Sequence, residues 1–93
     1  MGTAHPRSVE EARGHAQLVL ARRMIRAIKA AGLSEQEAAR LSGVSYATMN
    51  HYLNGKYAPD AITLAWFAAA CGTTVARLIG GAQDHGPATL AAA

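Results

Sequence analysis

Residues that typically start a helix and residues that typically end one recur along the chain. Five residues that can cap a helix N-terminus precede segments of helical character: Ser8, Ser34, Ser45, Asp60 and Thr74. Four glycines stand where such segments should end or turn: Gly32, Gly43, Gly55 and Gly72. A Glu follows three residues after Ser8 and again after Ser34, which is the spacing of a capping box. These recurring caps and glycines predict a set of short helices joined by tight turns.

Composition agrees with a small all-α domain. The chain has 93 residues, of which 51% are hydrophobic and 16% are charged, so it can bury one modest core. No alternating strand pattern appears, and the abundant Ala favours helix. The net charge of +3 is compatible with a nucleic-acid partner without establishing one. Cys71 is the only cysteine, which excludes an intrachain disulfide and suits a reducing cytoplasm.

We predict three parts of the chain. Residues 1–16 form a partly helical N-terminal extension, weakened by Gly14, and residues 17–80 form the folded domain. Residues 81–93 are rich in Gly and Ala without a periodic apolar pattern, which predicts a flexible tail. In the first helix of the domain the basic residues lie opposite the apolar ones, and we interpret most of them as a solvated face. They are Arg22, Arg23, Arg26 and Lys29.

Two short segments separated by a glycine predict a helix-turn-helix motif. The first helix covers about residues 35–42, with Ala38, Ala39 and Leu41 on its apolar side. Gly43 supplies the backbone conformation of the turn, and the small side chain of Ala39 permits the two helices to cross closely.

The second helix of this pair, residues 46–53, has two unlike faces. Val44, Met49 and Tyr52 anchor it to the rest of the domain, which leaves a row of small and hydrogen-bonding side chains outside. Asn can pair with the major-groove edge of adenine, Ala suits a thymine methyl group, and no acid on this face repels phosphate. We predict base reading by Tyr46, Ala47, Asn50 and His51, and phosphate contacts by Ser45, Thr48, Asn54 and Lys56.

The segment from Gly32 to Gly80 resembles the phage-repressor and Cro-type helix-turn-helix family, also called XRE-like. The residues that carry the resemblance are Ala39, Gly43-Val44-Ser45, Asn54-Gly55-Lys56, Pro59 and Thr63-Leu64. The resemblance implies a five-helix, lambda-repressor-like DNA-binding domain, here with an N-terminal helical extension, and a dimeric repressor. Where the family often has a phosphate-binding Gln, this chain has Glu35 followed by Gln36, so Gln36 joins the predicted phosphate contacts.

The predicted function is a sequence-specific transcriptional regulator. It would be a repressor of phage or mobile-element type that binds operator DNA as a homodimer. Trp66, Leu78 and Ile79 are the interface candidates, although Trp66 could instead pack under the N-terminal helix. One alternative is an antitoxin that binds a toxin through the N-terminal extension or the tail and controls its own promoter. Another is an accessory factor for recombination.

Other classes of function find no support in the sequence. The four histidines have no ligand spacing and no cysteine pair exists, so we predict neither a metal nor a cofactor. No acid pair or nucleophile–base arrangement indicates an enzyme. The first residues lack the apolar core of a signal peptide, and the longest apolar stretch, AITLAWFAAACG, is too short to span a membrane. We therefore expect a protein of the bacterial cytoplasm or nucleoid, phage-encoded in one reading.

Overall fold

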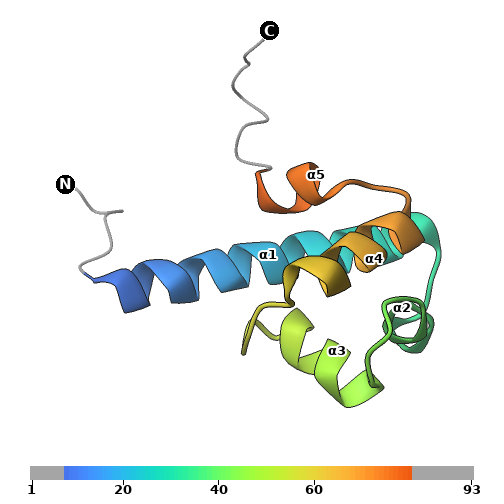
Figure 1. Ribbon diagram of the computed structural model, residues 1–93, viewed down its shortest axis with the longest axis horizontal. Helices are drawn as coiled ribbons and strands as arrows, with labels where there is room; N and C mark the ends of the chain where they lie inside the picture. The colour runs from blue at the N-terminus through green and yellow to red at the C-terminus, as the bar shows by residue number, and fades with distance from the viewer. Residues whose placement is uncertain (1–7, 81–93) are drawn as a thin grey trace, which may run out of the picture.

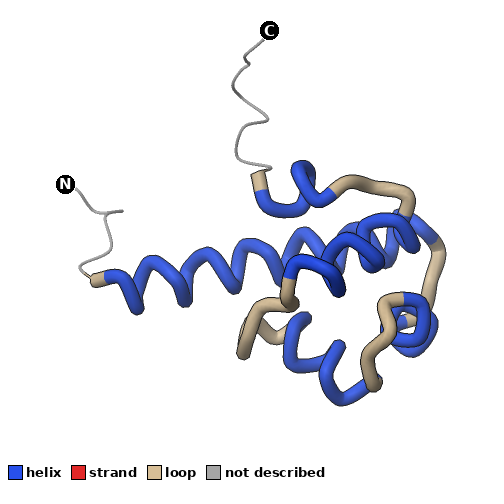
Figure 2. The backbone as a smooth tube through the Cα atoms, in the orientation of Figure 1, coloured by secondary structure: helices blue, strands red, loops and turns tan. Residues whose placement is uncertain are grey.

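A computed structural model describes residues 8–80 of the chain. Within them the chain forms five α-helices and no strand, which confirms the all-α prediction (Figure 1). Short loops connect the helices throughout this part of the chain (Figure 2). The helices are α1 (Val9–Ala31), α2 (Glu35–Leu41), α3 (Tyr46–Leu53), α4 (Ala61–Cys71) and α5 (Val75–Ile79).

Side-chain caps start all five helices. In each case a side-chain oxygen accepts a hydrogen bond from the backbone N–H three residues later, at 2.7–3.1 Å. These caps are the residues expected from the sequence: Ser8, Ser34, Ser45, Asp60 and Thr74. At Ser34 the capping box is complete, because the Glu37 carboxylate accepts from the Ser34 N–H at 2.9 Å. That backbone hydrogen bond lowers the pKa of Glu37, and the Thr63 N–H similarly lowers the pKa of Asp60.

The first helix is longer than the sequence suggested. α1 runs without a break from Val9 through Gly14 to Ala31, so the helical part of the predicted extension and the first helix of the domain are one element. In Figure 1 the N-terminal half of α1 projects beyond the other four helices. The predicted tail, residues 81–93, and the first seven residues lie outside the described part of the chain.

A compact apolar core joins all five helices. Met24 of α1, Met49 of α3 and Phe67 of α4 are completely buried at its centre. Around them lie Ile28, Ala38, Ala39, Leu53, Leu64, Ala68 and Leu78. The small side chains Ala38 and Ala39 let α2 approach α3 and α4 closely. The expectation that Leu41 also faces the core was wrong, because Leu41 lies at the end of α2 and is exposed.

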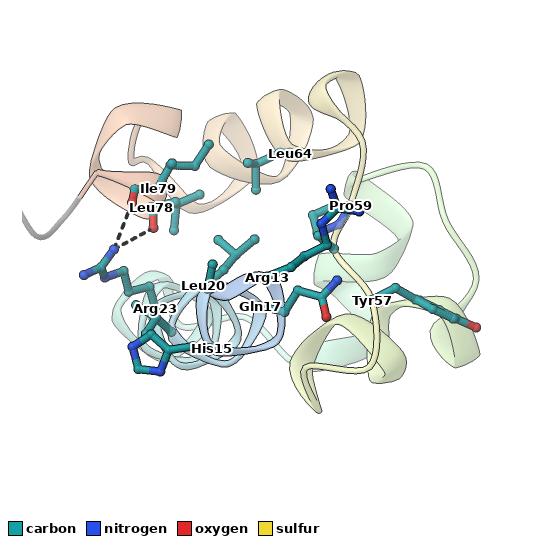
Figure 3. Close-up of a pocket in the computed structure, with 13 residues that line it drawn as sticks. Arg13, His15, Gln17, Leu20, Arg23, Tyr57, Pro59, Leu64, Leu78 and Ile79 are labelled. Atoms are coloured by element: carbon teal, nitrogen blue, oxygen red, sulfur yellow. Dashed lines mark hydrogen bonds between the residues drawn. The ribbon is translucent and has the colours of Figure 1, made fainter. Parts of the chain in front are cut away.

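An arginine links the first helix to the last. Arg23 of α1 donates from one guanidinium nitrogen to the carbonyl oxygens of Leu78 and Ile79, at 3.2 and 3.1 Å (Figure 3). These carbonyls lie at the C-terminal end of α5, where a positive charge is favourable. Arg23 is therefore half-buried and bound within the fold, not part of a fully solvated face.

Candidate nucleic-acid interface

The turn between α2 and α3 is fixed by contacts on both sides. The Gly43 N–H donates to the Arg40 carbonyl at 3.1 Å, and the Val44 N–H donates to the Ala39 carbonyl at 3.0 Å. Gly43 has a φ of 76°, which only glycine adopts without strain. The indole of Trp66 covers it so closely that a Cβ on Gly43 would lie 2.8 Å from Trp66 Cζ3. The angle between α2 and α3 is thus set by backbone and packing together.

The far end of α3 is held in a similar way by α1. Gly55, with a φ of 75°, follows the C-cap of α3. A Cβ there would lie 2.6 Å from Leu18 Cδ2 and 3.5 Å from Leu18 Cα, so the body of α1 packs directly on this glycine. No periodic signal in the sequence pointed to Leu18, because its side chain is about half exposed and its partner has no side chain.

Between these two ends the inner face of α3 is buried. Met49 is fully buried and Leu53, one turn later, is 7% exposed. Tyr52 and Val44 are half-buried and pack against the core, as expected from the sequence. Burial raises the pKa of the Tyr52 hydroxyl above its usual value, which agrees with a packing role for this ring. α3 is therefore a short, firmly seated helix with only one face free.

The four predicted base-reading residues all lie on α3 but differ in their surroundings. Tyr46 and Ala47 are exposed in its first turn. Asn50 and His51 are half-buried, and each has a neighbour. Asn54 donates from its side-chain nitrogen to Asn50 Oδ1 at 3.1 Å.

His51 packs edge-on against a tyrosine that sequence reasoning missed. The rings of His51 and Tyr57 are 5.0 Å apart between centroids, at an interplanar angle of 70°. Tyr57 is exposed in the loop after α3, directly after Lys56. A loop residue has no helical periodicity, so only its position after Asn-Gly-Lys could have pointed to it.

The predicted phosphate-binding residues at the start of α3 divide their roles. Ser45 Oγ accepts from the Thr48 N–H and donates its own hydrogen to Thr48 Oγ1, both at 3.0 Å. The Ser45 hydroxyl is therefore engaged in capping, whereas the hydroxyl hydrogen of Thr48 is left to donate elsewhere. This arrangement makes Thr48 the better side-chain donor to a phosphate at this end of the helix.

The segment that includes α3 and its flanking turns carries no acidic side chain. From Ala38 to Pro59 the chain contains no Asp or Glu, and it carries Arg40 and Lys56. Lys56 is exposed, and its N–H donates to the His51 carbonyl at 2.9 Å, which ties it to the end of α3. Gln36 is exposed in the first turn of α2, between Glu35 and Glu37. α3 and the loop after it therefore carry no carboxylate that would repel a phosphate, and Lys56 supplies a cation at the end of the helix.

The three interface candidates are not equivalent. Leu78 is 3% exposed within the core, so it offers no surface to a partner, and we withdraw it from the candidates. Ile79 is well exposed, and it lines a groove of about 920 Å³ between α1, α5 and the loop after α3 (Figure 3). Trp66 is 54% exposed, although part of its ring lies on Gly43.

The described part of the chain contains neither a candidate metal site nor an activated thiol. Residues 8–80 contain no group of three or more His, Cys, Asp or Glu side chains that could hold a metal ion. Cys71 is a half-buried free thiol whose pKa is raised by burial, so it stays protonated at neutral pH. None of the helices between residues 8 and 80 is long and apolar enough to cross a membrane.

Comparison with known protein families gives a match. A family model described as a helix-turn-helix domain matches residues 11–78, from the N-terminal half of α1 to α5. No curated protein and no solved structure matches the chain.

Proposed function

The chain belongs to the helix-turn-helix domain family, and from this premise we propose that it is a transcriptional regulator that reads operator DNA with α3. The observation that carries the proposal is the seating of α3. Its inner face is buried at Met49 and Leu53, and its two ends are held at Gly43 and Gly55. A helix held in this way presents its free face in one fixed orientation, as entry into the major groove requires.

The side chains on that free face suit base edges. Tyr46 and Ala47 stand exposed at the N-terminal end of α3, which enters the groove first in this motif. Asn50 and His51 follow one turn later, where Asn can pair with adenine in a bidentate manner. Thr48, Lys56, Gln36 and the second N–H of Asn54 would contact phosphates, which position the protein without reading sequence. The Ser45 side chain serves chiefly as the cap.

The regulator would act as a homodimer and repress by occupying its operator. One recognition helix covers only a few base pairs, so two half-sites separated by about 34 Å would supply the specificity. Exposed apolar side chains at Ile79 and Trp66 support this assembly, because they offer surface that a second copy could bury. A repressor of phage or mobile-element type remains our proposal for its biological role.

Selection of bound sequences from random duplex DNA tests the proposal. We expect the full chain to enrich a motif of two half-sites related by two-fold symmetry. Asn50→Ala should cost about 1–3 kcal/mol on that motif and relax the preference at one A·T pair. Val9→Ala, at the exposed start of α1, is the matched control and should bind like the wild type.

The selected motif, together with the proteins that co-purify with the chain, separates the alternatives. If no sequence is enriched, the proposal of a sequence-specific regulator is refuted. A motif that occurs at recombination sites and not at promoters would favour the accessory recombination factor. Co-purification of a small toxin encoded next to this chain would favour the antitoxin.

A further inference from the structure

The side chains of Asn50, on the outer side of α3, and Asn54, the C-cap of that helix, form a hydrogen-bonded pair. They are one helical turn apart, so their side chains lie one above the other. Asn54 Nδ2 donates to Asn50 Oδ1 at 3.1 Å, and the Asn54 N–H donates to the Asn50 carbonyl at 3.0 Å. Asn54 is the C-cap of α3, with its backbone set by this hydrogen bond. Two independent hydrogen bonds therefore hold Asn54 against Asn50.

The direction of the side-chain bond decides what Asn50 offers to a base. A carboxamide has one oxygen that accepts and one nitrogen that donates two hydrogens. Because Asn54 donates to the oxygen of Asn50, the Asn50 nitrogen keeps both of its hydrogens for another partner. Rotating the Asn50 carboxamide alone by half a turn would place two donors face to face and lose the bond, so Asn50 can turn only if Asn54 turns with it.

We propose that Asn54 is a positioning residue for base reading. It holds Asn50 Oδ1 so that the Asn50 amino group points at an acceptor on the major-groove edge, such as purine N7. The second lone pair of Oδ1 stays available for the N6 hydrogen of adenine, so the bidentate geometry is preserved. This inference rests on the proposed function, because it assumes that α3 faces DNA.

The role is distinct from the phosphate contact that the sequence predicted for Asn54. The second hydrogen of Asn54 Nδ2 is free to donate to phosphate, which would strengthen binding to every sequence alike. Positioning acts instead on the preference at one base pair. Once the DNA covers this pair and excludes water, a hydrogen bond that is lost there is no longer replaced by solvent.

The test compares five variants of the full chain on every single-base change of the preferred operator, at several salt concentrations. They are Asn50→Ala, Asn54→Ala, Asn54→Asp, the double variant Asn50→Ala/Asn54→Ala, and Lys56→Ala as control. Asn54→Ala should lower discrimination by about threefold or more at the base pair that Asn50→Ala affects. The double variant should discriminate there no worse than Asn50→Ala alone. Thermal melts of each variant establish that it is folded.

Asn54→Asp gives the sharpest readout. Asp at this position accepts but cannot donate, so Asn50 must turn its nitrogen towards it and its oxygen towards the base. The preference at that base pair should then fall for adenine, whose N7 loses its donor, and rise for cytosine, whose N4 amino group is an exposed donor. The added charge should also weaken binding to all sequences alike. Lys56→Ala should weaken binding to all sequences alike and lower the slope of log affinity against log salt concentration by about one. It should leave the base preference at every operator position unchanged.

Three outcomes would overturn the inference. Asn54→Ala could weaken binding to all sequences equally, while Asn50→Ala relaxes the base preference at one position. Asn54 would then be a phosphate contact only. The two effects at that position could instead add fully in the double variant. Asn50→Ala could also leave the base preference unchanged at every position. Asn50 would then contact no base, and Asn54 would have no base-reading side chain to position. If the wild type prefers no sequence, the proposed function itself is refuted. This outcome is seen with the wild type alone, so it cannot be confused with a failure of the inference about Asn54.

Discussion

The contact between Gly43 and Trp66 can be tested by adding a single methyl group to the turn. In Gly43→Ala the new Cβ would lie 2.8 Å from Trp66 Cζ3 and 3.0 Å from Cε3, too close for a stable contact. The φ of 76° adds left-handed strain of about 1–2 kcal/mol. The indole must also move outward and give up its packing on the turn. This loss is about 1 kcal/mol, because roughly half of the ring is exposed already.

Gly43→Ala should therefore lower the free energy of unfolding by about 2–3 kcal/mol. In a Trp66→Ala background only the backbone strain is left, so the same change should cost about 1–2 kcal/mol. The difference, about 1 kcal/mol, is the coupling energy between the two residues. Urea unfolding followed by circular dichroism measures all four proteins. Trp66 is the only tryptophan, so its emission in Gly43→Ala should shift to the red as the ring becomes more exposed.

Gly32→Ala is the matched control. Gly32 has nearly the same φ, 72°, but nothing lies within 4 Å of a Cβ placed there. It should show the backbone strain alone, with the same cost whether or not Trp66 is present. An equal cost of Gly43→Ala in both backgrounds, with unchanged emission, would refute the claim that the indole fixes the turn.

Three further predictions concern stability and assembly. Met49→Ala should cost about 2–5 kcal/mol in urea unfolding because it leaves a cavity under α3, and a loss below 1 kcal/mol would contradict that burial. Glu37 and Asp60 have folded-state pKa values below their usual 4.5 and 3.8, so their stabilisation is complete above those values and is lost as the pH falls through the lowered ones. Melting temperatures should therefore drop below about pH 4.5, and less steeply in Asp60→Asn, which cannot titrate. Light scattering should show a dimer for the wild type on DNA and a monomer for Ile79→Asp, whereas a monomeric wild type both free and on DNA would remove the proposed dimer.

The local sequence determined where the helices begin and which side of α3 faces outward. Caps such as Ser45 and Asp60 act within three residues, so their effect can be seen without knowledge of the fold. The burial of Met49 likewise follows from helical periodicity once one face of α3 is known to be apolar. For the same reason the pair of Asn50 and Asn54, one turn apart, lies within reach of sequence reasoning.

The tertiary structure decided the contacts that depend on how helices cross. Nothing within a few residues of Gly55 or Gly43 indicates Leu18 or Trp66, because these contacts bring a glycine backbone against a side chain from a distant helix. The burial of Leu78 is similar, since α5 has only five residues and is too short for periodicity to select one face. Packing against α1 and α4 selects that face instead, and so it is the crossing of the helices, not the local pattern, that turned Leu78 inward.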